Sequence, residues 1–114
     1  MSQQAYSSER YTSFSAFYPY YLSEHADPRC RTMHFIGTSL TFVVLAAAIF
    51  VHPLYLIGVP IAGYGFAWIG HFFLEKNKPA TFKYPLWSLI GDYTMYFSWL
   101  SGRLPKQLAQ AGVR

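Results

Sequence analysis

The chain has 114 residues, the size of one domain, with 53% hydrophobic and only 12% charged residues. That charged fraction is about half the usual value for soluble domains, which argues against an ordinary water-exposed surface. Aromatic residues make up 20% of the chain, as at a membrane interface. The net charge of +4 indicates contact with an anionic cytoplasmic leaflet rather than nucleic acid, because the basic residues do not gather on one helix face. A single cysteine, Cys30, excludes a disulfide framework.

Residues 1–12 are rich in Ser, Gln and Tyr, and we expect a mobile N-terminal segment without the apolar core of a signal peptide. The next apolar side chains recur at positions i, i+3, i+4, i+7 and i+8, which is one face of a helix. They are Phe14, Phe17, Tyr18, Tyr21 and Leu22. Pro19 lies among them, so the pattern predicts a short, bent helix at the membrane interface.

Two apolar runs of spanning length follow. Asp27 and Pro28 form a helix start signal, an N-cap acid and a proline at the first helical position. The run from Met33 to Val51 is long enough to cross a bilayer, which takes about 20 residues. His52-Pro53 predicts a tight reversal, and the second run extends from Leu54 to Leu74. The two runs therefore predict an antiparallel helical hairpin.

A third apolar run, from Leu86 to Leu100, is short and contains Asp92. Its length leaves open a re-entrant or tilted segment, a buried helix or a full span. Residues 104–114 read as a polar tail, so the main domain covers residues 13–103. The predicted fold class is all-α: a small polytopic membrane protein with a hairpin of two spanning helices, a short third apolar helix and an N-terminal interfacial helix.

The basic residues give the orientation. Several cations lie at the open end of the hairpin, before the first apolar run and after the second, whereas the reversal at residues 52–53 carries none. The cations at this open end are Arg29, Arg31, Lys76, Lys78 and Lys83. The positive-inside rule places them in the cytoplasm. We therefore expect an integral membrane protein, of the inner membrane if bacterial or the endoplasmic reticulum if eukaryotic, with its polar cluster facing the cytoplasm.

Three histidines fall at one end of the predicted hairpin. His34 lies about two turns inside the first helix and His71 about one turn inside the second, measured from the same side of the membrane. His25 precedes the first helix on that side. Three histidines and a carboxylate at one depth resemble the ligand set of a non-haem Fe(II) site. Each histidine also has a structural interpretation: a loop residue at a helix entry for His25, a bond to a neighbouring helix for His34, and an interfacial cap for His71.

The carboxylate that completes such a site is predicted from the free-energy cost of burying a charge and from its spacing to a histidine. Asp92 ranks first, as a direct ligand or as a partner of a ligand histidine, because an unpaired charge inside an apolar segment costs several kcal/mol. Glu75 ranks second, because it lies four residues after His71 on the same helix face. Asp92 could also pair with a cation for structure alone. His52 faces the other end of the hairpin and is left out of the site.

Four segments carry a resemblance to a known family: Tyr20–His25, Arg31–Thr38, Gly70–Ala80 and Pro85–Leu89. Over roughly residues 14–103 the chain resembles the Mpo1-like family, and the Gly-His…Glu-Lys-Asn…Pro-Ala block is its most specific part. The resemblance implies a membrane enzyme like the fungal founding member of the family. That member is an Fe(II)-dependent dioxygenase of the endoplasmic reticulum, which shortens 2-hydroxy fatty acids by one carbon in α-oxidation.

The same resemblance implies that His25, His34 and His71 bind Fe(II), with O2 and a 2-hydroxy fatty acid as substrates. Arg31 or Lys76 would then neutralise the substrate carboxylate, although topology alone also explains these cations. The competing interpretation is non-enzymatic: a small membrane scaffold, or a haem protein in which His34 and His71 are the axial ligands. We expect the lipid bilayer as a partner and no nucleic acid, and homo-oligomerisation is left open.

Overall fold

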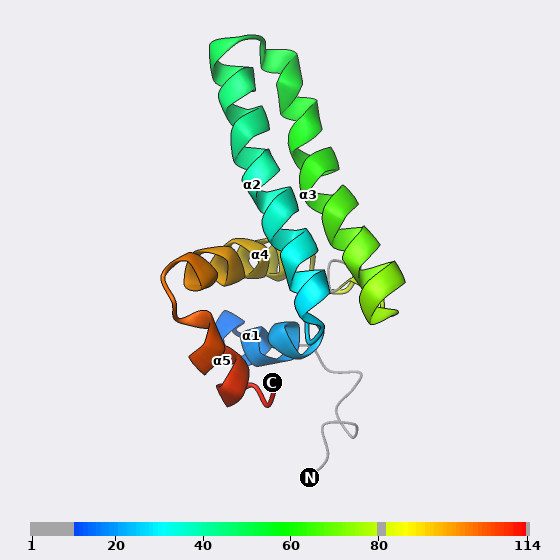
Figure 1. Ribbon diagram of the computed structural model, residues 1–114, viewed down its shortest axis with the longest axis vertical. Coiled ribbons are helices and arrows are strands. Elements are labelled where there is room, and N and C mark those ends of the chain that lie inside the picture. Colours follow the sequence, from blue (N-terminus) through cyan, green and yellow to red (C-terminus); the bar gives the residue numbers. More distant parts are fainter. Residues whose placement is uncertain (1–10, 80–81, 114) are drawn as a thin grey trace.

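The computed structural model describes residues 11–79 and 82–113, and within these ranges every regular element is a helix (Figure 1). In chain order the elements are α1 (Phe14–Ser23), α2 (Pro28–Phe50), the 3-10 helix η2 (Pro53–Ile57), α3 (Gly58–Ile69), the π-helical segment η3 (Gly70–Glu75), α4 (Pro85–Leu100) and α5 (Leu104–Gln110). The all-helical prediction is therefore confirmed. Most of the predicted mobile segment, residues 1–10, lies outside the described residues.

The two long apolar runs form the predicted antiparallel hairpin (Figure 1). Its first helix begins as the sequence predicts, because Asp27 accepts a hydrogen bond from the Arg29 backbone N–H at 2.8 Å and Pro28 is the first helical residue. Each arm is a helical stretch of 23 residues, Pro28–Phe50 and Pro53–Glu75. Both arms are long and apolar enough to cross a membrane.

Small residues let the two arms approach each other closely. A Cβ atom at Gly37 would lie 3.0 Å from the Ala62 carbonyl oxygen and 3.0 Å from the Phe66 Cβ. By contrast, a Cβ atom built at Gly65 would have no described atom within 4 Å beyond its own stretch of helix backbone. The hairpin therefore needs a missing side chain at Gly37 but not at Gly65.

Helix α4 crosses the half of the hairpin that is far from its turn (Figure 1). Helices α1 and α5 pack against α4 and lie below it in the view. Two hydroxyl pairs fix this crossing: Tyr96 with Ser39 at 2.9 Å and Tyr93 with Thr41 at 3.0 Å. The ring of Trp99 also stacks on Phe35, with a centroid distance of 4.3 Å. The third apolar run is therefore a helix that crosses the hairpin rather than running alongside it.

The region expected to be a polar tail contains a short packed helix. Leu104, Leu108 and Val113 are buried, and they join Phe17 and Tyr21 of α1 in one hydrophobic core. Only three large apolar side chains occur among residues 104–113, which is too weak a periodic pattern to predict a helix. Packing against α1 and α4 stabilises α5.

The contrast between the two glycines gives a test. We expect Gly37→Ala to lower the free energy of unfolding by about 1–3 kcal/mol, because the added methyl group meets backbone and Cβ atoms that have little room to move. Gly65→Ala should cause no loss, because its methyl group enters open space. Thermal unfolding of the two variants in detergent checks this, and an equal loss in both would contradict the described packing of the hairpin.

Candidate metal centre

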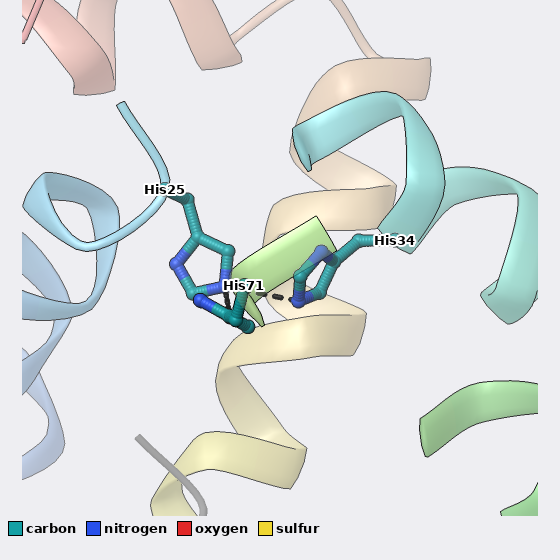
Figure 2. A group of neighbouring side chains, drawn as sticks. All are labelled: His25, His34 and His71. Atoms are coloured by element: carbon teal, nitrogen blue, oxygen red, sulfur yellow. Dashed lines mark hydrogen bonds between the residues drawn. The ribbon is translucent and has the colours of Figure 1, made fainter. Parts of the chain in front are cut away.

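Three histidines from three segments of the chain point toward one another (Figure 2). His25 lies just after α1, His34 in the second turn of α2, and His71 in η3. All three side chains are buried, with exposed fractions of 1%, 4% and 2%. One ring nitrogen from each falls in a group whose members all lie within 4.8 Å of one another. The prediction that these histidines share one depth of the fold is confirmed.

The Nδ1 atom of each histidine ring contacts an oxygen atom. His25 Nδ1 lies 2.6 Å from the Tyr21 carbonyl oxygen and His34 Nδ1 lies 2.9 Å from the Cys30 carbonyl oxygen. A carbonyl oxygen can only accept a hydrogen bond, so in both rings Nδ1 carries the proton. Nε2 of each neutral ring is then an unprotonated nitrogen with a free lone pair.

The third ring is held through a short chain of amide contacts. Asn77 Nδ2 donates to the Glu24 carbonyl oxygen at 3.1 Å, which fixes the orientation of the Asn77 amide. Asn77 Oδ1 must then face His71 Nδ1, 2.7 Å away, and accept its proton. His71 therefore also presents an unprotonated Nε2 atom.

These unprotonated atoms lie very close together. His25 Nε2 is 3.0 Å from His34 Nε2 and 2.9 Å from His71 Nε2 (Figure 2). Two lone pairs at that distance repel unless a cation lies between them. Burial, followed by the charges that His34 and His71 would carry, holds the pKa of His25 well below its usual range, so a proton is a poor candidate for that cation. A metal ion about 2.1 Å from two imidazole nitrogens at about 90° would separate them by about 3.0 Å, and the donor set fits such an ion.

A carboxylate lies beside this group. Asp92 Oδ1 is 4.0 Å from His34 Nε2 and accepts a hydrogen bond from the Tyr21 hydroxyl. Burial raises the pKa of Asp92 to about 7, while the bond from Tyr21 acts in the opposite direction. The structure thus brings the first-ranked carboxylate next to the histidines, at a distance at which it can orient a group bound there.

The other predicted residues lie at the margin of the site. The Glu75 carboxylate accepts a hydrogen bond from the Asp27 backbone N–H, so it ties the end of η3 to the start of α2. Arg31 Nη1 donates to the carbonyl oxygens of His25 and Ala26 at 2.7 and 3.0 Å, and so fastens the loop that carries His25. Lys76 is exposed and ends the helix in the left-handed conformation, with φ of 60°.

Sequence reasoning assigned no site role to Tyr21 and Asn77. The Tyr21 ring stacks on His25 with a centroid distance of 4.1 Å while its hydroxyl binds Asp92, so one side chain holds two residues of the site. The Tyr21 ring also fills the space above Gly91, where an added Cβ would lie 3.0 Å from it. The only sequence signal for Asn77 was its place in the block that begins at His71.

A cavity of about 210 Å³ extends from the site between the hairpin and α4. His34 and Asp92 lie at its polar part, and the remaining lining is mostly apolar or small. The other lining residues are Thr38, Thr41, Val59, Pro60, Gly63, Tyr64, Leu89 and Tyr93. A molecule with a polar head and an apolar chain matches this lining.

These features define an all-helical protein with a buried three-histidine centre. The model of the Mpo1-like family, described as 2-hydroxy-palmitic acid dioxygenase Mpo1-like, matches residues 11–104. The chain therefore belongs to the Mpo1-like family, as its histidine motifs indicate. No curated protein and no solved structure matches it.

Removal of one ligand tests the centre. We expect His25→Ala, His34→Ala and His71→Ala each to lose bound metal, because two imidazoles alone hold an ion weakly, while circular dichroism shows that the helices remain. His52→Ala, at the exposed turn of the hairpin, should keep its metal. Metal content of the purified proteins is the measurement, and loss in His52→Ala equal to the others would place the site elsewhere.

A second test addresses the outer contact of His71. Asn77→Ala removes the acceptor that orients this ring, and we expect metal affinity to fall about 10–100-fold, the usual effect of losing such a partner. The neighbouring Lys78→Ala is the matched control, because Lys78 is exposed and should leave the affinity unchanged. Competition titration against a metal chelator measures both, and equal affinities would refute the role of Asn77.

Proposed function

We propose that this chain is a membrane-associated, Fe(II)-dependent dioxygenase that converts a 2-hydroxy fatty acid into the fatty acid one carbon shorter. The observation that carries the proposal is the convergence of the unprotonated Nε2 atoms of His25, His34 and His71. The matched family is described by 2-hydroxy-palmitic acid dioxygenase activity, which supports the substrate class. The two apolar arms of spanning length support a lipid environment.

The overall reaction balances without an outside reductant. A 2-hydroxy acid and one O2 give the shortened acid, CO2 and one water, so the C1–C2 bond breaks and C2 becomes the new carboxyl carbon. Four electrons leave the substrate and reduce O2 completely. When bound, Fe(II) would supply adjacent open positions for O2 and for the hydroxyl and carboxyl oxygens of the substrate.

The residues around the centre have distinct proposed roles. His25, His34 and His71 would hold the iron through Nε2. Asp92, 4.0 Å from His34 Nε2, is the proposed acceptor of a proton from the substrate hydroxyl, and the hydrogen bond from Tyr21 would keep its carboxylate in place. Arg31 and Lys76 are the proposed cations for the substrate carboxylate, and the acyl chain would occupy the cavity between the hairpin and α4.

The geometry favours a bare ion over haem. A porphyrin lies between its two axial nitrogens, but His25 Nε2 sits only 3.0 and 2.9 Å from the corresponding atoms of His34 and His71. His25 therefore occupies the space that a porphyrin would need between His34 and His71, and neither pair that includes His25 leaves room for a porphyrin plane. The third imidazole also has no role in a haem site, which takes two axial ligands.

An activity assay tests the proposal. Protein loaded with Fe(II) in detergent should consume one O2 for each long-chain 2-hydroxy acid and form the acid one carbon shorter, because all the electrons come from the substrate. The fatty acid without the 2-hydroxyl group should not react, and the reaction should stop under argon or after chelation. Mass spectrometry of the products and an oxygen electrode measure this.

Two controls separate the proposal from its alternatives. His71→Ala should lack both iron and activity, whereas His52→Ala should keep both. An intense Soret band in the optical spectrum would identify a haem protein, and protein without stoichiometric iron or turnover would indicate a scaffold. Either result would overturn the proposed function.

A further inference from the structure

The far end of the hairpin has an unusual surface for a loop that emerges into water. Residues 49–57 carry no charge, and their only polar side chains are His52 and Tyr55; the exposed fractions of Phe50, Val51 and Leu54 are 83%, 72% and 68%. The sequence also contains no charged residue between Arg31 and Glu75. This end of the hairpin therefore lacks the Lys and Arg residues that mark the first boundary between lipid and water.

The position of α4 fixes the boundary between lipid and water on the side of the histidine centre. One face of this helix exposes a row of apolar side chains at helical spacing. These residues are Leu86, Leu89, Ile90, Phe97 and Leu100. Lys83 precedes the helix and Arg103 follows it, so both of its ends must stay near water or lipid headgroups. Helix α4 therefore lies at the interface with its apolar row against the hydrocarbon.

The hairpin extends only a limited distance beyond that level. Asp92 of α4 lies 4.0 Å from His34 of α2. Two hydroxyl pairs also join α4 to Ser39 and Thr41, so α4 crosses α2 between His34 and Thr41. From His34 to the end of α2 at Phe50 there are about 16 residues, which rise about 24 Å. The hydrocarbon core of a bilayer is about 30 Å thick. The hairpin thus ends before it reaches the opposite headgroups.

The backbone of the turn is also suited to hydrocarbon, where an unpaired N–H is costly. The N–H groups of Val51 and His52 both donate to the Ala47 carbonyl oxygen, at 2.8 and 3.1 Å. Pro53 has no N–H group, and the Leu54 N–H donates to His52 Nδ1 at 3.1 Å. The His52 side chain therefore satisfies a backbone N–H group of the turn itself.

From these observations we propose that the hairpin ends inside the bilayer, with residues 49–57 in the hydrocarbon of the far leaflet and no loop on the far face. Both long helices then enter and leave the membrane from the side that carries the histidine centre. The inference rests on the membrane location in the proposed function, but not on iron or catalysis.

Thiol accessibility in sealed vesicles tests this with the full chain. Phe50→Cys and Leu54→Cys should react with a membrane-impermeant maleimide from neither side, and should react once detergent dissolves the membrane. Lys78→Cys, at the open end of the hairpin, should react from one side. The unsubstituted protein sets the background, because its Cys30 is buried. Reaction of Leu54→Cys from either side of the intact vesicle overturns the proposal.

A charge at the tip gives a second measurement. Val51→Arg should reduce the fraction of protein retained in the membrane after an alkaline wash severalfold relative to Val51→Leu, because the tip cannot reach water. Equal retention of the two variants overturns the proposal. Iron content and turnover are measured separately in detergent, so failure of the proposed dioxygenase would leave this result unchanged, and the reverse also holds.

Discussion

The site depends on one constraint: each histidine gives its Nδ1 proton to an oxygen atom. For His25 and His34 that oxygen is a carbonyl four residues earlier, so the local helical backbone supplies it. For His71 it is the side chain of Asn77, which the Glu24 carbonyl holds in orientation. With the Nδ1 atoms occupied, the three Nε2 lone pairs lie close together, so the buried cluster can hold a cation.

The fold serves this arrangement by bringing distant segments to one level. The Glu75 carboxylate binds the Asp27 backbone N–H, which joins the end of one arm to the beginning of the other. Helix α4 then crosses the hairpin and carries Asp92 to His34. A buried carboxylate is costly, and Tyr21 offsets part of that cost with its hydroxyl while its ring packs on His25. The same contacts that assemble the helices therefore assemble the site.

Local signals in the sequence were sufficient for the hairpin and for the depth of the histidines. The Asp27-Pro28 start and the reversal at residues 52–53 are local patterns, and an antiparallel pair of known rise places His34 and His71 together by arithmetic. The crossing of α4 depends instead on hydroxyl pairs between residues more than fifty positions apart, which no local pattern contains. The role of Asn77 and the packing of α5 escaped prediction for the same reason, because both depend on contacts with distant segments.

The proposed function gives a physical reason for a polar centre next to an apolar hairpin. A fatty acid with a 2-hydroxyl group keeps its chain in lipid and its head near water, so an enzyme acting at carbons 1 and 2 must work at the boundary. The cavity between the hairpin and α4 runs from His34 and Asp92 into surroundings lined by Val59 and Leu89. A centre placed deeper would have to strip the carboxylate of water at high cost, and one placed further out would pull the chain from the hydrocarbon. If the apolar face of α4 lies on the hydrocarbon as proposed, the level at which α4 crosses the hairpin would satisfy both requirements.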